Sequence, residues 1–152
     1  MHDLSNDDAQ ACRDALAAEQ AASLAKTAGW SHVDKEQVHS DWDVLYRRLA
    51  IERAGTSPSA PHIQDLIAQH YAIACRFYVP SREAYIGMSL FYGENLEMRT
   101  FHNSYGPDLV AFLSEAMQHY ASHKLGPVPR PKLTAGTVVA LALGKIRPRA
   151  RP

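Results

Sequence analysis

Apolar side chains recur at helical spacing in one stretch of this chain after another, and no stretch alternates in the manner of a half-buried strand. Val38, Trp42, Leu45 and Leu49 follow one another at intervals of four, three and four residues, which places their side chains on one face of a helix. A chain that repeats such one-sided stripes can bury them by packing helix against helix. The sequence therefore predicts an all-α fold.

Helix-capping and helix-breaking residues divide these stripes into about five helices. Ser5, Asp34, Ser59 and Ser81 are the expected N-caps, because a short side-chain oxygen at that position can accept a backbone N–H bond. Pro80 is expected to end the third helix. The expected helical segments are residues 7–28, 34–54, 59–79, 81–92 and 107–125, with a short helical piece at 96–102.

The first expected helix differs from the others because its apolar stripe is thin. Leu16 and Leu24 are the only large aliphatic side chains in the Ala-rich residues 7–28. A narrow stripe offers little surface to bury against a core. We therefore expect residues 1–30 to be a flexible helical segment beside a main domain at residues 31–125.

The charges of the chain are unevenly distributed. The whole sequence has 16 Lys and Arg residues and 16 Asp and Glu residues, for a formal net charge of zero. Residues 1–125 carry a balance of −6, and the Pro-rich residues 126–152 carry +6. The acidic balance argues against nucleic-acid binding by residues 1–125. The basic tail is expected to be disordered or to be sequence added during cloning, and a nucleic-acid or membrane-surface arm is the alternative.

The ends and the apolar runs of the chain bear on its location. No apolar run approaches the roughly 18–20 residues that a membrane-spanning helix needs. The first eight residues are acidic, where a secretory signal would be basic and then apolar. We therefore expect a cytoplasmic protein with no membrane partner.

The motifs of several enzyme classes are absent from the sequence. There is no Gly-x-Ser-x-Gly turn, no Gly-rich phosphate loop and no basic pattern that would activate Cys12 or Cys75. These two cysteines also lack metal-ligand spacing and are too few for a disulfide framework. We expect neither an enzyme nor a bound cofactor.

The histidines offer one arrangement that a metal ion could use. Glu115, His119 and His123 follow one another at intervals of four residues, so they share a helix face. Their order differs from that of the zinc proteases, and His123 lies where the helix frays. A solvated face that complements the negative end of the helix dipole is the favoured interpretation, and we expect no metal site.

Aromatic side chains are the strongest indication of function. They cluster between residues 42 and 120, and the chain has seven tyrosines, whose hydroxyl groups need partners when they are buried. Trp42, Phe77 and Phe112 are most simply explained as core residues, and His70 as a core histidine that could also donate into a pocket. A cleft with apolar walls and several hydroxyl groups would suit a large, flat, mostly apolar ligand.

Four segments of the chain resemble, in order, the motifs of the TipAS antibiotic-recognition domain. They are IQDLIAQHY at 63–71, FYVPSREAY at 77–85, FYGENLEM at 91–98 and GPDLVAFLSEAMQHYA at 106–121. The resemblance covers about residues 35–125. It implies a globin-like helical fold without haem, a cleft for bulky amphipathic molecules such as thiopeptide antibiotics, and N-terminal helices that are loose until a ligand binds.

One departure from the family pattern concerns covalent capture. Members that trap thiopeptides covalently have a cysteine one turn before a Met-Tyr pair, and residues 86–92 contain none. The linking motif also differs, with Asn95-Leu96-Glu97-Met98 in place of Asp-x-Arg-Phe. These departures argue against covalent binding and leave the identity of the ligand open.

The resemblance implies a function and a set of contact residues. The chain is expected to be the ligand-sensing effector domain of a MerR-type transcriptional activator, monomeric by itself, in a homodimeric regulator that contacts DNA through a winged-helix domain missing before Met1. The alternatives are a stand-alone protein that sequesters an antibiotic and the effector domain of a stress or stationary-phase regulator. The expected ligand-binding residues are Trp42, Tyr46, His70, Tyr71, Tyr85, Met88, Tyr92, Phe112 and Met117.

Overall fold

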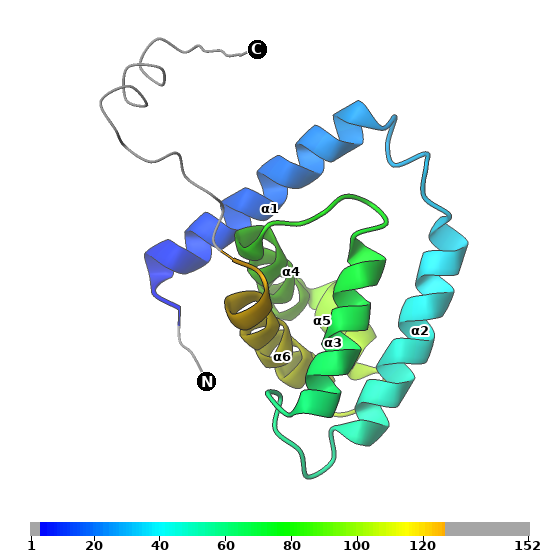
Figure 1. Cartoon of the computed structure of the whole chain (residues 1–152), viewed down its shortest axis with the longest axis vertical. Helices are drawn as coiled ribbons and strands as arrows, with labels where there is room; N and C mark the ends of the chain where they lie inside the picture. The colour runs from blue at the N-terminus through cyan, green and yellow to red at the C-terminus, as the bar shows by residue number, and fades with distance from the viewer. Residues whose placement is uncertain (1–3, 127–152) are drawn as a thin grey trace.

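Helices form all of the regular secondary structure in residues 4–126, which are the residues that the computed structural model describes. The all-α prediction is therefore confirmed. The tail predicted for residues 126–152 lies, apart from Gly126, outside the described residues. The helices are α1 (Asn6–Lys26), α2 (Lys35–Glu52), α3 (Pro61–Ala74), α4 (Arg82–Glu94), α5 (Leu96–Asn103) and α6 (Leu109–Lys124) (Figure 1).

Helix α4 is the central element of the fold. Helices α1, α5 and α6 all pack against it, while α2 packs against α3, and α3 also contacts α6 (Figure 1). The core between these helices contains fully buried side chains such as Leu49 of α2, Ile63 and Leu66 of α3, and Leu113 and Met117 of α6. The arrangement is compatible with the expected globin-like fold.

Three of the four predicted N-caps are confirmed by side-chain hydrogen bonds. The hydroxyl oxygens of Ser5 and Ser81 and a carboxylate oxygen of Asp34 each accept a backbone N–H bond from the third residue of their helix, at 3.0–3.1 Å. The predicted cap at Ser59 is wrong. Helix α3 begins at Pro61, whose fixed φ suits a first helical position, and Ala60 precedes it without a side-chain bond.

Helix α3 is also shorter than the sequence predicted. It ends at Ala74, six residues before Pro80, and the restriction that a proline places on its preceding residue reaches only Val79. Residues 75–81 then lead to α4. On this loop the ring of Phe77 meets the ring of Trp30 edge to face, with centroids 4.9 Å apart. The early helix end therefore adds an aromatic side chain to the surface next to α1.

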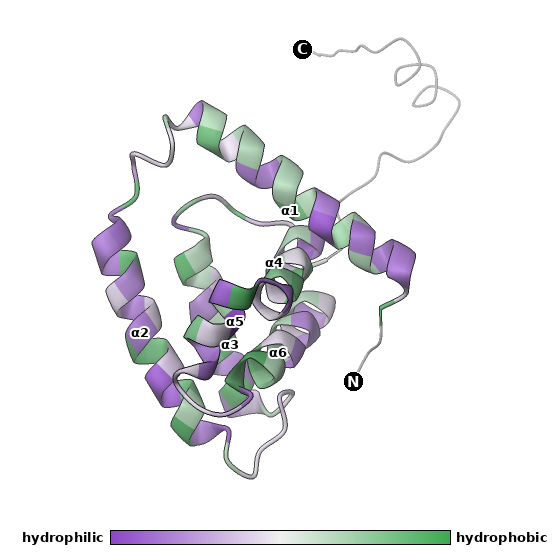
Figure 2. Ribbon diagram, turned by 180° about the vertical axis from the view of Figure 1, so that it is seen from behind, coloured by the Kyte–Doolittle hydropathy of each residue, from purple (hydrophilic) through white to green (hydrophobic). Residues whose placement is uncertain are grey.

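Helix α1 packs across α4 by close backbone approach rather than by a broad apolar stripe. Its buried positions are Ala9, Cys12, Leu16 and Ser23, and in Figure 2 it is coloured mainly pale green and purple. A Cβ atom built on Gly87 of α4 would lie 2.2 Å from the carbonyl oxygen of Cys12. Only glycine at position 87 allows this contact. Helix α1, which has few large apolar side chains, therefore packs on α4 through small residues.

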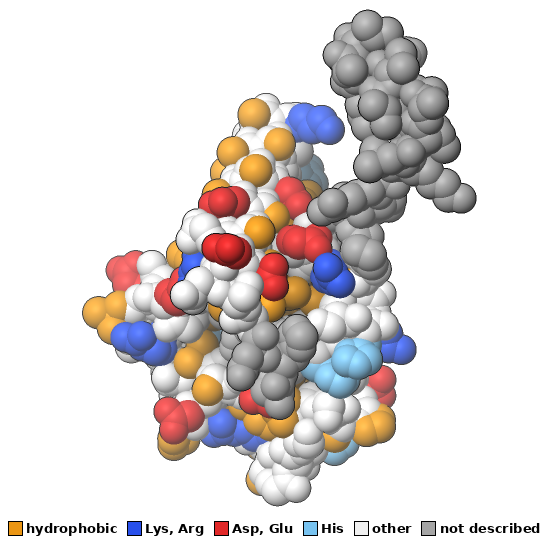
Figure 3. Space-filling view, turned by 90° about the vertical axis from the view of Figure 1, so that its left-hand side faces the viewer, with side chains coloured by type: hydrophobic (Ala, Val, Ile, Leu, Met, Phe, Trp, Pro, Cys, Tyr) orange, Lys and Arg blue, Asp and Glu red, His pale blue; other side chains and the backbone are white. Residues whose placement is uncertain are grey.

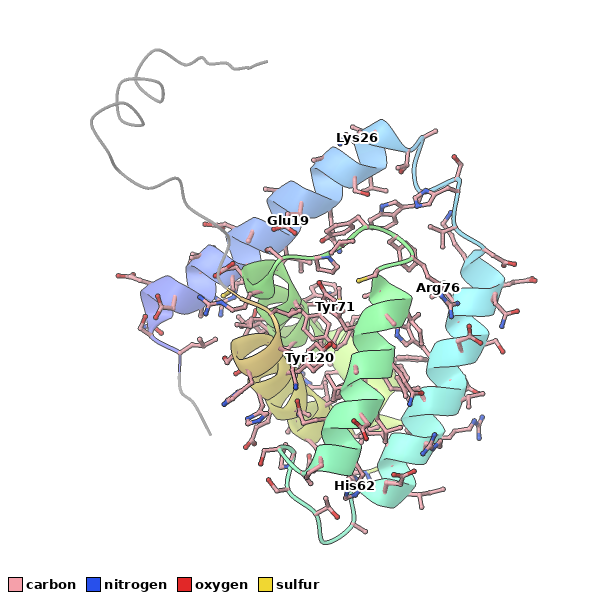
Figure 4. All side chains as sticks on the ribbon, viewed as in Figure 1. Glu19, Lys26, His62, Tyr71, Arg76 and Tyr120 are labelled. Carbon is pink, nitrogen blue, oxygen red and sulfur yellow. The ribbon has the colours of Figure 1, made fainter. Side chains whose placement is uncertain are left out.

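Polar contacts hold α1 near both ends of α4. The carboxylate of Glu19, which is labelled in Figure 4, accepts hydrogen bonds from the backbone N–H and the hydroxyl of Ser81, the N-cap of α4. At the other end, the Arg13 guanidinium donates from Nε to the Glu94 carboxylate at 2.9 Å and also from a terminal nitrogen. The flexibility predicted for residues 1–30 is a property in solution and stays a prediction.

The surface around the start of α1 is acidic. Figure 3 shows acidic side chains gathered at this end of the molecule, and Asp7 and Asp8 occupy the first turn of α1. Negative charge in a first turn favours the helix, because it opposes the positive end of the helix dipole. The charge therefore supports a helix whose packing surface is small.

Candidate ligand-binding site

Two adjoining hollows with aromatic walls lie between α2, α4 and α5. We call them the α1 hollow, of about 200 Å³, which α1 helps to line, and the α5 hollow, of about 570 Å³, to which α5 contributes four residues. Trp42, Tyr92 and Met98 belong to the walls of both. Three other hollows of 390–550 Å³ have at most one Phe, Tyr or Trp ring in their walls, that of Tyr105. Aromatic lining therefore distinguishes this pair.

The α1 hollow is lined almost entirely by apolar and aromatic side chains. Its walls come from α1, from the loops before α2 and α4, and from α2 to α5. They consist of Leu16, Gln20, Trp30, Trp42, Ala74, Phe77, Tyr78, Met88, Phe91, Tyr92 and Met98. Such a surface suits the apolar part of a small molecule.

The α5 hollow combines aromatic rings with carboxylates. Its walls come from α2, α4, α5 and the residue that follows α5 by two positions. They consist of His39, Trp42, Asp43, Tyr46, Tyr92, Glu97, Met98, Phe101, His102 and Tyr105. The hollow therefore offers aromatic rings and negative charge to a bound molecule.

The structure brings four of the nine predicted contact residues to these hollows. Trp42 and Tyr92 line both, Tyr46 lines the α5 hollow, and Met88 lines the α1 hollow. Trp42 and Tyr46 come from α2, and Met88 and Tyr92 come from α4. Their contact with a ligand stays a prediction.

The other five predicted residues line neither hollow. His70, Tyr85 and Met117 are fully buried, and Phe112 is half-buried on α6. Tyr71 lies between α3 and α6 near Tyr120, as Figure 4 shows, and its hydroxyl donates to a backbone carbonyl. A ligand would reach the three fully buried side chains only after the core rearranged, and contact of any of the five with a ligand stays a prediction.

Several wall residues were missed as contacts by sequence reasoning. Trp30 was placed in the flexible segment, but its positive φ of 65° turns it back, and its indole nitrogen donates to Ser23 at 2.8 Å. Phe91 and Phe101 are 44% and 48% exposed, and they contribute open aromatic surface to the hollows. Their membership of the aromatic cluster was visible in the sequence, whereas their orientation was not.

Two buried polar atoms without partners belong to the walls of the α1 hollow. Among residues 4–126, the buried side-chain atoms that lack a hydrogen bond are Trp42 Nε1, the Tyr78 hydroxyl and Glu83 Oε1. An unsatisfied buried donor or acceptor costs about 1–3 kcal/mol. Trp42 and Tyr78 therefore leave this wall less stable than its apolar contacts alone would make it.

A chain of hydrogen bonds, which we call the Tyr–His chain, crosses the core behind the hollows. The Tyr85 hydroxyl lies 2.8 Å from Nδ1 of His70, and His70 Nε2 lies 3.1 Å from the Tyr46 hydroxyl. That hydroxyl lies 3.2 Å from Nε2 of His102, whose Nδ1 lies 2.7 Å from the Met98 carbonyl oxygen. The chain links α4, α3, α2 and α5, and its Tyr46 and His102 reach the α5 hollow.

All four members of the Tyr–His chain are neutral at pH 7. Burial lowers the pKa of His70 to about 3, and nearby His102 adds to this effect. Burial also lowers the pKa of His102 and raises the pKa values of Tyr46 and Tyr85 well above the ordinary value for tyrosine. Each histidine therefore has one N–H group and one accepting nitrogen.

The Met98 carbonyl sets the direction of every bond in the chain. A carbonyl can only accept, so His102 donates from Nδ1 and must accept at Nε2 from the Tyr46 hydroxyl. That hydroxyl has one hydrogen, which it donates to His102, so its oxygen can only accept a hydrogen bond from Nε2 of His70. His70 then accepts at Nδ1 from Tyr85. Every polar atom in this sequence of bonds is satisfied.

Because His70 is buried and neutral, we expect the free energy of unfolding to fall in mild acid. In the unfolded chain a histidine takes up a proton as pH falls through about 6.5, whereas folded His70 stays neutral to about pH 3. The free energy of unfolding should fall by about 2 kcal/mol from pH 7 to pH 5 because of His70, and further because of His102. Urea denaturation at both values measures the difference.

The carboxylates do not interfere in this pH range. The pKa values of Asp41, Asp43 and Glu94 are lowered by hydrogen bonds to arginines, so these groups reduce stability only when pH falls below the ordinary carboxylate range. In NMR spectra the ring signals of His70 should not shift between pH 7 and pH 4.5. A free energy of unfolding that stays constant from pH 7 to pH 5 would contradict the burial of neutral histidines.

Residues 4–126 contain no group of three or more His, Cys, Asp or Glu side chains that could hold a metal ion. The rings of His119 and His123 stack with centroids 3.9 Å apart, and His123 Nδ1 donates to the His119 carbonyl.

None of the described helices is long and apolar enough to cross a lipid bilayer.

Comparison with known proteins agrees with the resemblance seen in the motifs. Residues 9–120 match the model of the TipAS antibiotic-recognition domain, and the match includes most of α1 as well as the segments that carry the motifs. Comparisons with curated proteins and with solved structures gave no match. The family match spans well over half of the sequence. The chain therefore belongs to the TipAS antibiotic-recognition domain family.

Proposed function

We propose that this chain is the ligand-sensing effector domain of a MerR-type transcriptional activator, and that it binds bulky amphipathic molecules such as antibiotics in the α1 and α5 hollows. Its family is one of ligand-recognition domains rather than of enzymes. The observation that carries the proposal is the pair of adjoining aromatic hollows that share Trp42, Tyr92 and Met98. DNA contact belongs, in such a regulator, to a separate winged-helix domain.

The chemistry of the walls supports binding of varied ring systems. Aromatic rings stack on flat ligands, and such pairs contribute about 0.5–1.5 kcal/mol beyond the area that they bury. Met88 and Met98 can adapt their shape to different ligands, because their side chains are unbranched and polarizable. Exposed Phe91 and Phe101 would lose contact with water when a ligand covers them.

The unpartnered atoms in the α1 hollow favour a ligand with hydrogen-bonding groups. The indole N–H of Trp42 can only donate, and the Tyr78 hydroxyl can donate or accept. A ligand carbonyl or ring nitrogen that reached Trp42 after a small movement of the wall would remove the cost of its unsatisfied donor. A purely apolar molecule would not.

The position of the α1 hollow suggests how binding could be transmitted. Its wall joins Leu16 and Gln20 of α1 to Trp42 of α2 and Met98 of α5. A ligand seated there would contact helices that are far apart in the sequence, so it would favour one relative position of them over others. This is the property that an effector domain needs.

Intrinsic fluorescence can test the proposal without a label. The chain has two tryptophans, Trp30 and Trp42, and both line the α1 hollow. Titration with thiopeptides and other hydrophobic antibiotics should therefore give a saturable change in tryptophan emission for at least one compound. The absence of saturable change with every compound would contradict ligand binding at this site.

Substitution of Phe91 tests the location of the site. Phe91→Ala removes an exposed ring from the α1 hollow, so it should raise the Kd of a bound antibiotic about five- to tenfold with little effect on stability. Leu96→Ala is the matched control, because Leu96 is 66% exposed nearby and lines neither hollow. Equal Kd values for the two variants, measured by the same titration, would argue against this wall.

A further inference from the structure

The two hollows differ in charge. The walls of the α5 hollow contain the carboxylates of Asp43 and Glu97 and no lysine or arginine, whereas the walls of the α1 hollow contain no charged side chain. Residues 1–125 as a whole carry a balance of −6. A molecule that spans both hollows would therefore meet an apolar surface at one end and a negative surface at the other.

The two carboxylates are available to a ligand in different degrees. Asp43 Oδ2 accepts from Arg47 at 2.9 Å, and Asp43 Oδ1 accepts from the Tyr105 hydroxyl at 2.7 Å; these bonds lower the pKa of Asp43. Arg47 is itself largely exposed and lies outside the hollow. Glu97 is exposed and makes no hydrogen bond or ion pair within residues 4–126. Glu97 is therefore free to pair with a cation.

Aromatic rings surround these carboxylates. Tyr46, Phe101 and Tyr105 form a group with centroids 5.4–6.3 Å apart, and Trp42 and Tyr92 complete the walls of the α5 hollow. The face of an aromatic ring carries partial negative charge and attracts an organic cation within about 6 Å of its centre. A ring that turns its face to a bound cation would therefore attract it in the same direction as the carboxylates do.

From this charge pattern we infer that the ligand class is an amphipathic organic cation, whose charged group lies in the α5 hollow and whose apolar part lies against Trp42, Tyr92 and Met98 toward the α1 hollow. This inference rests on the proposed ligand-binding function and adds the sign of the ligand's charge. A neutral ligand of the same shape would gain the stacking contacts but not the attraction to Glu97. An anion would be repelled.

Three probes of similar shape and different charge test the inference. Tetraphenylphosphonium is a cation, triphenylphosphine oxide is neutral, and tetraphenylborate is an anion. Each is titrated into the protein while the emission of Trp30 and Trp42 is followed. Tetraphenylphosphonium should bind most tightly and tetraphenylborate least tightly, and added salt should weaken the binding of the cation most, because it screens the carboxylates.

A carboxylate variant then locates the charge preference. Glu97→Gln should raise the Kd of tetraphenylphosphonium about three- to fivefold, as expected for an exposed ion pair, and should leave the Kd of triphenylphosphine oxide unchanged. Asp65→Asn is the matched control, because Asp65 is an exposed carboxylate on α3 outside both hollows. It should change neither value.

The outcomes separate this inference from the function on which it rests. Equal binding of the cationic and neutral probes, or a Glu97→Gln variant that keeps the wild-type ratio of their Kd values, would overturn the cation preference while leaving ligand binding in place. The absence of saturable binding for every probe, together with no response to antibiotics, would overturn both.

Discussion

Replacement of Tyr46 by Phe is expected to lower the free energy of unfolding by about 2–6 kcal/mol. The substitution removes one buried hydroxyl, which accepts from His70 and donates to His102. Both imidazoles then retain a polar nitrogen without a partner in the core, and each unsatisfied group costs about 1–3 kcal/mol. The ring itself still fills its place, so the loss comes from hydrogen bonding and not from a cavity.

Urea denaturation at pH 7 measures this loss, and Tyr105→Phe is its control. Tyr105 also donates its hydroxyl proton to a side chain, but it is half-buried, and its partner Asp43 keeps the bond to Arg47. Its removal should cost about 1 kcal/mol or less. Equal losses in the two variants would contradict the expectation that the Tyr–His chain contributes more to stability than a half-buried hydrogen bond does.

Replacement of Gly87 by Ala is expected to displace α1 from α4 and to lower the free energy of unfolding by about 1–3 kcal/mol. The added Cβ would lie 2.2 Å from the carbonyl oxygen of Cys12 and 3.1 Å from Cβ of Leu16. A backbone oxygen cannot turn aside as a flexible side chain can, so the whole helix has to move. Hydrogen exchange should therefore become faster in residues 6–26 while it changes little in α3 and α6.

The same helix provides the control for this substitution. A Cβ atom on Gly93 of α4 meets no heavy atom within 4 Å. Gly93→Ala should leave exchange in α1 unchanged, and it should be neutral or stabilising by up to about 1 kcal/mol, because alanine favours the helix. Unchanged exchange in α1 of the Gly87→Ala variant would contradict the close approach.

Local patterns predicted most of the helices correctly. The caps at Ser5, Asp34 and Ser81 depend on a side chain and a backbone group three residues apart, so their geometry is determined within one turn. The apolar stripe of α2 could be predicted from the helical spacing of its residues alone. Errors occurred at the ends of α3, where competing local signals from Ser59, Pro61 and Pro80 had to be weighed against one another.

Contacts between distant segments account for what the sequence did not predict. The spacing around His70 shows that it faces the core, but its partners Tyr46 and Tyr85 lie 24 and 15 residues away on other helices. Nothing in a single stretch of sequence gives this pairing. In the same way, α1 docks on α4 through the Cys12 carbonyl, which lies against Gly87. A prediction based on the thin apolar stripe of α1 therefore underestimated the contact between the two helices.

The Tyr–His chain ends at the Met98 carbonyl, and this end determines the direction in which its hydrogen bonds run. The two histidines are opposite tautomers, with the proton on Nε2 in His70 and on Nδ1 in His102. This pattern begins at a main-chain carbonyl, which no substitution of Met98 removes. The internal polarity of the core therefore depends on where helix α5 lies rather than on the identity of a side chain, and a shift of that helix would be needed to reverse it.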